Sequence, residues 1–163
     1  MRFAPVLVLG TTLALPSVAR GEDMTMGNAS SASGIGVGVE SILSGPTGPT
    51  VVYQTPSFHV SGLLGFRDDG DDTDITLAGR FFYQVHAGEL ADFNVGGGVG
   101  IVHRDDGDNA DQDLHLEGGA KIRVFLAPNV ALSSTLGLSL VPDGESAFTG
   151  QLQGTMGITY FFF

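Results

Sequence analysis

The 163-residue sequence contains no cysteine, and it therefore has no disulfide framework. Basic residues are also scarce, because seven lysines and arginines stand against 18 acidic residues and give a formal net charge of −11. Nucleic-acid phosphates require a basic footprint, so this charge balance argues against a nucleic-acid partner. Long apolar runs are missing as well. After the first 19 residues, no segment approaches the ~18 apolar residues that a membrane helix needs.

The N-terminus has the composition of a secretory signal peptide. Arg2 supplies the positive start, Phe3–Leu15 the apolar run, and the small residues ending at Ala19 a cleavage site. The run is too short for a transmembrane anchor, so we expect cleavage after Ala19 or nearby. Removal of residues 1–19 takes away Arg2 and leaves 18 acidic and six basic residues, a net charge of about −12. Residues 20–33 are small and polar, and we expect a short flexible lead there.

What the sequence does have is glycine, 25 residues in all, and apolar side chains that recur at every second position. In Asp113–Leu126, for example, aliphatic residues share one face and charged residues share the other. Successive side chains of a β-strand point to opposite faces, so this period predicts strands, and no segment keeps helical spacing over three turns. The predicted strands are Ile35–Leu43, Thr50–Thr55, Phe58–Phe66, Ile75–His86, Asp92–His103, Asp113–Leu126, Val130–Leu140 and Ala147–Phe163.

The strand count depends on Pro56. If Thr50–Phe66 were one strand, the count would be seven and the two chain ends would lie on opposite sides of a barrel. Proline cannot donate to a strand ladder and is rare in a central strand. Membrane barrels made from one bacterial chain also have an even number of strands. Both points favour two strands separated at Pro56, with the seven-strand alternative left open.

A period of two does not say whether the apolar face is buried in a core or faces lipid, but the composition of the polar face does. It consists mostly of glycine, serine, threonine and glutamine, whereas a soluble surface carries abundant lysine and glutamate. The connections after the third and fifth predicted strands, Arg67–Asp74 and Arg104–Gln112, are longer and acidic, which is the outer-membrane pattern of short periplasmic turns and long external loops. We therefore expect an all-β, closed, up-and-down eight-stranded transmembrane barrel over residues 34–163. A soluble secreted β-sandwich is the alternative.

Aromatic residues support this threading. With both chain ends in the periplasm, outward aromatic side chains gather at the periplasmic ends of the strands, as an interfacial girdle does in a membrane barrel. The residues of this predicted girdle are Tyr53, Phe58, Tyr83, Phe93, Tyr160 and Phe162.

The last strand carries a further signal. Gly157, Tyr160 and Phe162 resemble the C-terminal insertion signal of bacterial outer-membrane barrels, with one extra residue, Phe163, beyond the usual end. The chain as a whole resembles the small eight-stranded outer-membrane barrels of the OmpA transmembrane-domain type. The resemblance implies recognition by the barrel-assembly machinery of a Gram-negative cell envelope, contact with outer-membrane lipid and lipopolysaccharide, a monomer, and a structural or surface-interaction role.

Five charged residues face the interior of the predicted barrel: Glu40, Arg80, Glu117, Lys121 and Arg123. A buried charge costs several kcal/mol unless it is paired, so we expect the two glutamates to bind the arginines or the lysine. An eight-stranded barrel is just wide enough for side chains to fill, which favours a structural polar plug. The resemblance leaves a second reading open, since interior salt bridges in that family have been read as the gate of a narrow channel, and the alternative function is then a narrow pore or transporter for small polar solutes or ions.

The sequence offers little for catalysis, a cofactor or a metal. By strand parity His59, His86 and His115 point inward, and outward His103 has no clear outward serine and glutamate beside it. The acidic connections fail the calcium-loop template, which leaves solvated charge or a weak divalent site toward lipopolysaccharide phosphate. Gly96–Gly100 precedes no helix and is no phosphate-binding loop. We expect no enzyme, no cofactor and no bound metal.

Overall fold

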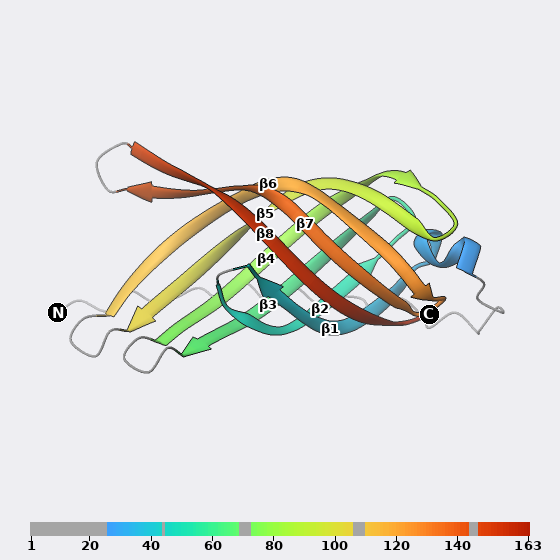
Figure 1. Ribbon diagram of the computed structural model, residues 1–163, viewed down its shortest axis with the longest axis horizontal. Helices are drawn as coiled ribbons and strands as arrows, with labels where there is room; N and C mark the ends of the chain where they lie inside the picture. The colour runs from blue at the N-terminus through green and yellow to red at the C-terminus, as the bar shows by residue number, and fades with distance from the viewer. Residues whose placement is uncertain (1–25, 44, 69–72, 106–109, 144–146) are drawn as a thin grey trace, which may run out of the picture.

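The chain forms a closed antiparallel β-barrel in the computed structural model (Figure 1). The structure describes residues 26–43, 45–68, 73–105, 110–143 and 147–163, so the expected signal peptide over residues 1–19 lies outside it. Strands that follow one another in the chain are hydrogen-bonded neighbours, and β8 pairs with β1 to close the ring. The elements are η1 (Met26–Ser31), a 3₁₀ helix, and the strands β1 (Gly34–Ile42), β2 (Thr47–Gln54), β3 (Phe58–Asp68), β4 (Thr73–Ala87), β5 (Ala91–Asp105), β6 (Ala110–Ala127), β7 (Val130–Asp143) and β8 (Ala147–Phe162).

The eight-strand prediction is confirmed, and the seven-strand alternative is wrong. Pro56 lies in the turn between β2 and β3, where the amide of Thr55 donates to the carbonyl of Phe58 at 2.8 Å. The Thr55 hydroxyl also accepts a hydrogen bond from the amide of Phe58 at 3.1 Å. This turn reverses the chain, so β2 and β3 pair antiparallel with Tyr53 opposite Val60.

The barrel is apolar outside and polar inside. Large aliphatic and aromatic side chains stand exposed on its outer surface, and Leu77, for example, is 62% exposed. Charged side chains are enclosed, and Arg80 and Lys121 are each only 3% exposed. A soluble barrel or sandwich buries its apolar face, so this arrangement confirms the inverted prediction and removes the β-sandwich alternative. None of the described residues forms a helix long and apolar enough to cross a membrane.

The two ends of the barrel differ (Figure 1). One end carries η1, the C-terminus and the short turns after β2, β4 and β6, and we call it the terminal end. The opposite end carries the connections after β1, β3, β5 and β7, and we call it the loop end. Strand register places the six predicted girdle aromatics near the terminal end, as the pairs Phe58–Tyr83 and Ile35–Phe162 show. Within this ring Tyr160 and Phe162 meet edge to face at 5.1 Å between centroids.

The strands reach further into the acidic connections than expected. β3 continues to Asp68, β4 begins at Thr73, β5 ends at Asp105 and β6 begins at Ala110, so only residues 69–72 and 106–109 connect them, outside the described part of the chain. The ladder persists because cross-strand charges compensate one another there. Asp74 lies opposite Arg104, whose side chain forms ion pairs with Asp74 and Asp113. Strand β6, with 18 residues, is roughly 60 Å long, which exceeds the apolar thickness of a bilayer even when tilted.

Three local expectations need correction. The second predicted strand, Thr50–Thr55, begins earlier, because β2 starts at Thr47 and its ladder to β3 skips only Gly48 and Pro49, where proline has no N–H. His86 was expected inside but is exposed, since a register shift between Gln84 and His86 places it opposite outward Phe93. The lead over residues 20–33 is not without structure, since η1 forms within it.

Candidate functional site

The terminal end of the lumen is closed by apolar side chains. Ala29 of η1, Val52, Phe125, Ala131 and Phe161 form one buried cluster, and Phe163 packs against it with its ring 5.5 Å from that of Phe161. We call these six residues the terminal seal. The extra C-terminal residue therefore fills this end of the lumen from inside. The helix is fastened by Gln54, whose side-chain amide donates to the carbonyls of Ala29 at 2.8 Å and Ala32 at 3.0 Å.

A buried arginine cluster lies directly behind the seal. The guanidinium of Arg123 donates to both carboxylate oxygens of Asp92, at 2.5 to 3.1 Å, and to Gln54 Oε1 at 2.6 Å. The same guanidinium lies over the ring of Phe125 at 5.5 Å. Asn94 completes the cluster by donating to Asp92 at 2.6 Å. Every one of these polar side chains is buried, and together they block the lumen at this depth.

The next level towards the loop end holds a second ring of large side chains. Phe82 and His59 stack at 5.3 Å, and both are almost fully buried. Lys121 lies over the Phe82 ring at 5.3 Å and reaches Glu40 at 3.6 Å. Both ring nitrogens of His59 lack a hydrogen-bond partner among the described residues. Phe82, His59 and Lys121, which come from three different strands, thus fill the lumen between the Arg123–Asp92 cluster and the ion pairs of Arg80.

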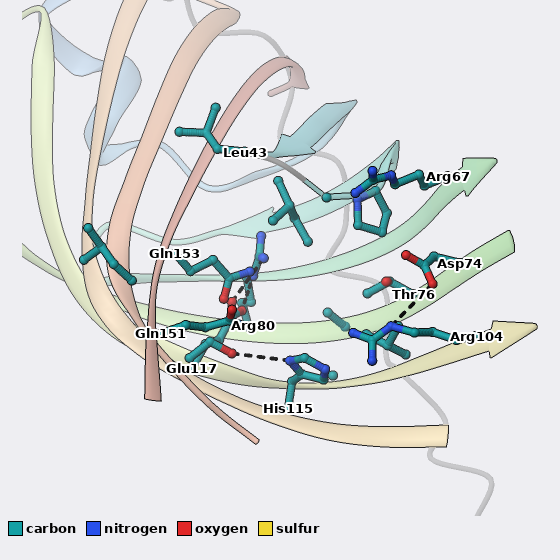
Figure 2. A pocket seen from close by; sticks show the side chains of 18 residues that line it. Leu43, Arg67, Asp74, Thr76, Arg80, Arg104, His115, Glu117, Gln151 and Gln153 are labelled. Atoms are coloured by element: carbon teal, nitrogen blue, oxygen red, sulfur yellow. Dashed lines mark hydrogen bonds and ion pairs between the residues drawn. The ribbon is translucent and has the colours of Figure 1, made fainter. Parts of the chain in front are cut away.

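Arg80 occupies the middle of the barrel. Its guanidinium forms ion pairs with Glu40 on one side and Glu117 on the other. Arg80 and Glu40 are almost fully buried, whereas the Glu117 side chain is 18% exposed. That difference in exposure places Glu117 at the boundary between the filled half of the lumen and the open half. Figure 2 shows the Arg80–Glu117 contact at the inner end of the cavity.

Beyond this pair the lumen opens into a cavity of about 460 Å³, which we call the vestibule (Figure 2). Its floor is the Arg80–Glu117 pair, and its mouth lies among the loop-end residues Leu43, Asp74 and Arg104. One part of its wall is polar, with Gln151, Gln153, Ser139, His115 and Thr76. Another part is aliphatic, with Ile42, Ala78 and Val102.

The mouth of the vestibule is held by ion pairs. Arg104 Nη1 lies 2.6 Å from Asp113, and its Nε lies 3.5 Å from Asp74. The Arg104 side chain is 52% exposed, so these pairs are hydrated and individually weak. They nevertheless connect β4, β5 and β6 beyond the apolar belt, and they set the width of the mouth on this side.

One serine–histidine contact invites comparison with hydrolases. His115 Nδ1 lies 3.4 Å from Ser139 Oγ at the vestibule wall. A catalytic triad needs a carboxylate on the other ring nitrogen, but His115 Nε2 has no hydrogen-bond partner in the described part of the chain. Ser139 is also only 1% exposed. This pair lacks the geometry of a nucleophile and its base. No group of three or more histidine and acidic side chains that could hold a metal ion occurs within the described ranges.

The five charged residues named from sequence fall into two groups. The structure brings together Glu40, Arg80, Glu117 and Lys121 at mid-barrel, from the strands β1, β4 and β6. Arg123 pairs with neither glutamate and binds Asp92 instead. Of the proposed insertion signal, Gly157 faces the lumen beside Glu40 and Ser133, and Tyr160 and Phe162 face outward.

Comparison with known proteins gives a fold. No family model and no curated protein matches the chain. Among solved structures, the N-terminal β-barrel domain of Pseudomonas aeruginosa OprF matches with a TM-score of 0.60 and 15% identity, over 78% of this chain and 95% of that one. Neisserial surface protein A matches with a TM-score of 0.51 and 10% identity, over 78% of this chain and 93% of that one. The chain has the fold of the small eight-stranded outer-membrane barrels.

Sequence reasoning missed several residues that fill this small outer-membrane barrel fold. Asp92 was taken only as the start of a strand, although it has the same inward parity as Asn94. The alternating pattern could therefore have predicted that its side chain faces the lumen. Gln54 and η1 carried no comparable signal, because their contact joins residues that lie 25 positions apart in the chain, with β1 between them. The vestibule was also not expected, since the lumen of an eight-stranded barrel was taken to be filled throughout.

Proposed function

We propose that this protein is an integral outer-membrane β-barrel with a closed lumen and a structural or surface-interaction role, and that it has no catalytic activity. The exposed aliphatic belt supports a place in a bilayer, and the likeness to OprF and Neisserial surface protein A in fold supports the outer membrane. The terminal end then faces the periplasm and the loop end faces the exterior, as short turns and longer extensions do in such barrels.

The observation that carries the closed state is the succession of filled levels across half the lumen. The terminal seal, the Arg123–Asp92 cluster, the Phe82–His59 ring and the Arg80 ion pairs follow one another from the terminal end. Most side chains of each level are almost fully buried, and they contact partners from other strands or from η1. A continuous water path would need all four levels to move together. This favours the plug over the narrow pore.

The proposed partners follow from the proposed location. Residues 1–19 would direct export, and Gly157, Tyr160 and Phe162 would be read by the barrel-assembly machinery during insertion. Outer-membrane lipid would contact the aliphatic belt, and lipopolysaccharide would lie against the loop end. The protein would act as a monomer, because the closed ring leaves no strand edge for a partner chain. The proposed role requires no cofactor.

Two measurements on one preparation test this proposal. The full chain is expressed with its N-terminal segment, and the outer-membrane fraction is run on a gel with and without heating. We expect the unheated protein to migrate faster, because a closed barrel resists unfolding in detergent. Recovery in the aqueous fraction without such a shift would contradict the membrane assignment.

The same protein is then inserted into planar bilayers. We expect no single-channel steps for the native chain, with a known large porin as the positive control for detecting conductance. Reproducible steps from heat-shifted protein would contradict the closed lumen and establish the pore alternative. Glu117→Gln serves as the probe of a gate, because it weakens the floor of the vestibule and leaves the three deeper levels intact.

A further inference from the structure

We propose that the vestibule is a binding site for a small uncharged polyhydroxylated solute, that is, for one or two saccharide units. A cavity of about 460 Å³ is within the usual range for a small-molecule site. It opens at the loop end and closes at the Arg80–Glu117 pair, so a solute that enters from outside would be retained. The proposed structural role requires no such site, and the inference therefore goes beyond it.

The charges of the vestibule select against an ionic ligand. Arg80 is compensated by Glu40 and Glu117, and Arg104 at the mouth is compensated by Asp74 and Asp113. Arg67, which also lines the cavity, is not free either. An anion or a cation at the floor of the vestibule would have to displace a partner of the buried Arg80 and leave a charge unpaired at low dielectric. A neutral ligand disturbs none of them.

Several hydrogen-bonding groups that line the vestibule, by contrast, have no partner among the described residues. The hydroxyl of Thr76 and Nε2 of His115 have no hydrogen-bond partner among the described residues, and Thr76 is only 4% exposed. The side-chain amides of Gln151 and Gln153 also make no hydrogen bond within the described ranges. An amide both donates and accepts, and so does a hydroxyl. Buried polar groups such as the Thr76 hydroxyl and His115 Nε2 rarely lack partners in folded proteins, and a ligand rich in hydroxyls would supply partners for them and for the more exposed amides of Gln151 and Gln153.

The aliphatic part of the wall fits the same class of ligand. Ile42, Ala78 and Val102 line the cavity, and Ala78 and Val102 are buried on the inner faces of β4 and β5. A saccharide ring has hydroxyls at its edge and C–H groups on its faces, so it can pack a face on these side chains while its edge reaches the glutamines. A purely apolar ligand would leave the amides unpaired, at a cost in affinity.

The test uses the full chain, folded in a detergent whose head group contains no sugar. The probes are glucose, N-acetylglucosamine and sucrose, and their charged counterparts are glucuronate and glucosamine. Binding is followed by saturation-transfer NMR and by the shifts of the glutamine side-chain amides. We expect saturable binding of at least one neutral sugar, with its charged counterpart about tenfold weaker or not detectable.

Two matched variants assign the site. Gln153→Leu removes the donors and the acceptor with little change of volume, and we expect it to weaken binding about three- to tenfold. Gln112→Leu makes the same change on β6 at the loop end, outside the vestibule lining, and we expect it to leave binding unchanged. Equal effects of the two variants, equal binding of charged and neutral sugars, or no saturable binding at all would each overturn the proposal.

A last arm separates the possible sources of the saccharide. A neutral oligosaccharide fragment of the lipopolysaccharide core, freed of its phosphates and acidic sugars, is compared with the free sugars on the same protein. Tighter binding of the oligosaccharide assigns the vestibule to the glycan of its own membrane, and comparable binding assigns it to free solutes. Heat-shifted migration and silence in bilayers, measured on the same preparation, report on the closed barrel separately. Loss of sugar binding is thereby distinguished from failure of the proposed function.

Discussion

The ion pairs at the middle of the lumen make a quantitative prediction for Arg80→Met. Arg80 and Glu40 are almost fully buried, so removal of the guanidinium leaves Glu40 with Lys121, at 3.6 Å, as its remaining cationic partner among the described residues. Glu117 is better placed, since its partly exposed carboxylate can be hydrated from the vestibule. Breaking a buried ion pair from one side costs about 3–5 kcal/mol. We expect a loss of this size in the free energy of unfolding, or roughly two to three and a half orders of magnitude in the folded-to-unfolded ratio.

Arg104→Met is the matched control. Arg104 also bridges two carboxylates, but its side chain is 52% exposed at the mouth of the vestibule. Hydrated pairs of this kind contribute about 0–1 kcal/mol, so the same substitution should cost far less there. Glu117→Gln should lie between the two, at about 1–2 kcal/mol, because Arg80 keeps Glu40 and the amide oxygen still accepts a hydrogen bond.

The assay is urea unfolding of each protein folded in phospholipid vesicles, with the slope of the transition compared to confirm that the same structure unfolds. Heat-shifted migration shows that each variant has formed a barrel before it is titrated. The double variant Arg80→Met with Glu117→Gln should cost less than the sum of the two single changes, since they share one contact. Equal losses in the free energy of unfolding for Arg80→Met and Arg104→Met would refute the argument that burial makes the mid-barrel ion pairs contribute more to stability than the exposed ones.

The remaining predictions concern the wall, the lipid face and the terminal end. Gly119→Ala should lower the free energy of unfolding by about 1–3 kcal/mol, because the new Cβ would lie 2.6 Å from the Cα of Gly137 on β7. Gly79→Ala should leave it unchanged, because nothing lies within 4 Å of the Cβ position there. Urea unfolding measures both variants. Leu77→Arg should cost about 2–4 kcal/mol by the same measurement, and an unchanged stability would place that face outside the hydrocarbon. Gln54→Leu should speed amide hydrogen exchange in η1 while the strands stay protected, and unchanged protection of η1 would show that packing alone holds it.

Much of the barrel was determined by the local pattern of the chain. Alternation with a period of two predicts where strands lie and which side chains share a face, since successive residues of a strand point to opposite sides. The proline at position 56 separates β2 from β3 for an equally local reason, because it has no N–H to donate. The inverted placement of apolar residues followed from the composition of the opposite face, which is mostly glycine, serine, threonine and glutamine and suits a lumen, not a soluble surface.

Partners within the lumen were beyond that pattern. Parity says that Arg123 points inward, but its contact with Asp92 depends on how far β5 is displaced along β6, and its contact with Gln54 depends on closure of the ring. Strand parity also predicted the wrong direction for the His86 side chain, since one register shift in β4 moves it from the lumen to the outer surface. The prediction that the lumen is filled throughout was wrong for the loop end, where the vestibule lies.

The sequence by itself determined eight strands and the direction of nearly every side chain, because those properties depend on neighbours within one strand. Only the tertiary structure decided which charges meet, that η1 and Phe163 close one end, and that a cavity remains at the other. The physical reason is that depth along the barrel axis is set by strand stagger and tilt. These are properties of the closed hydrogen-bonded ring and of no single strand.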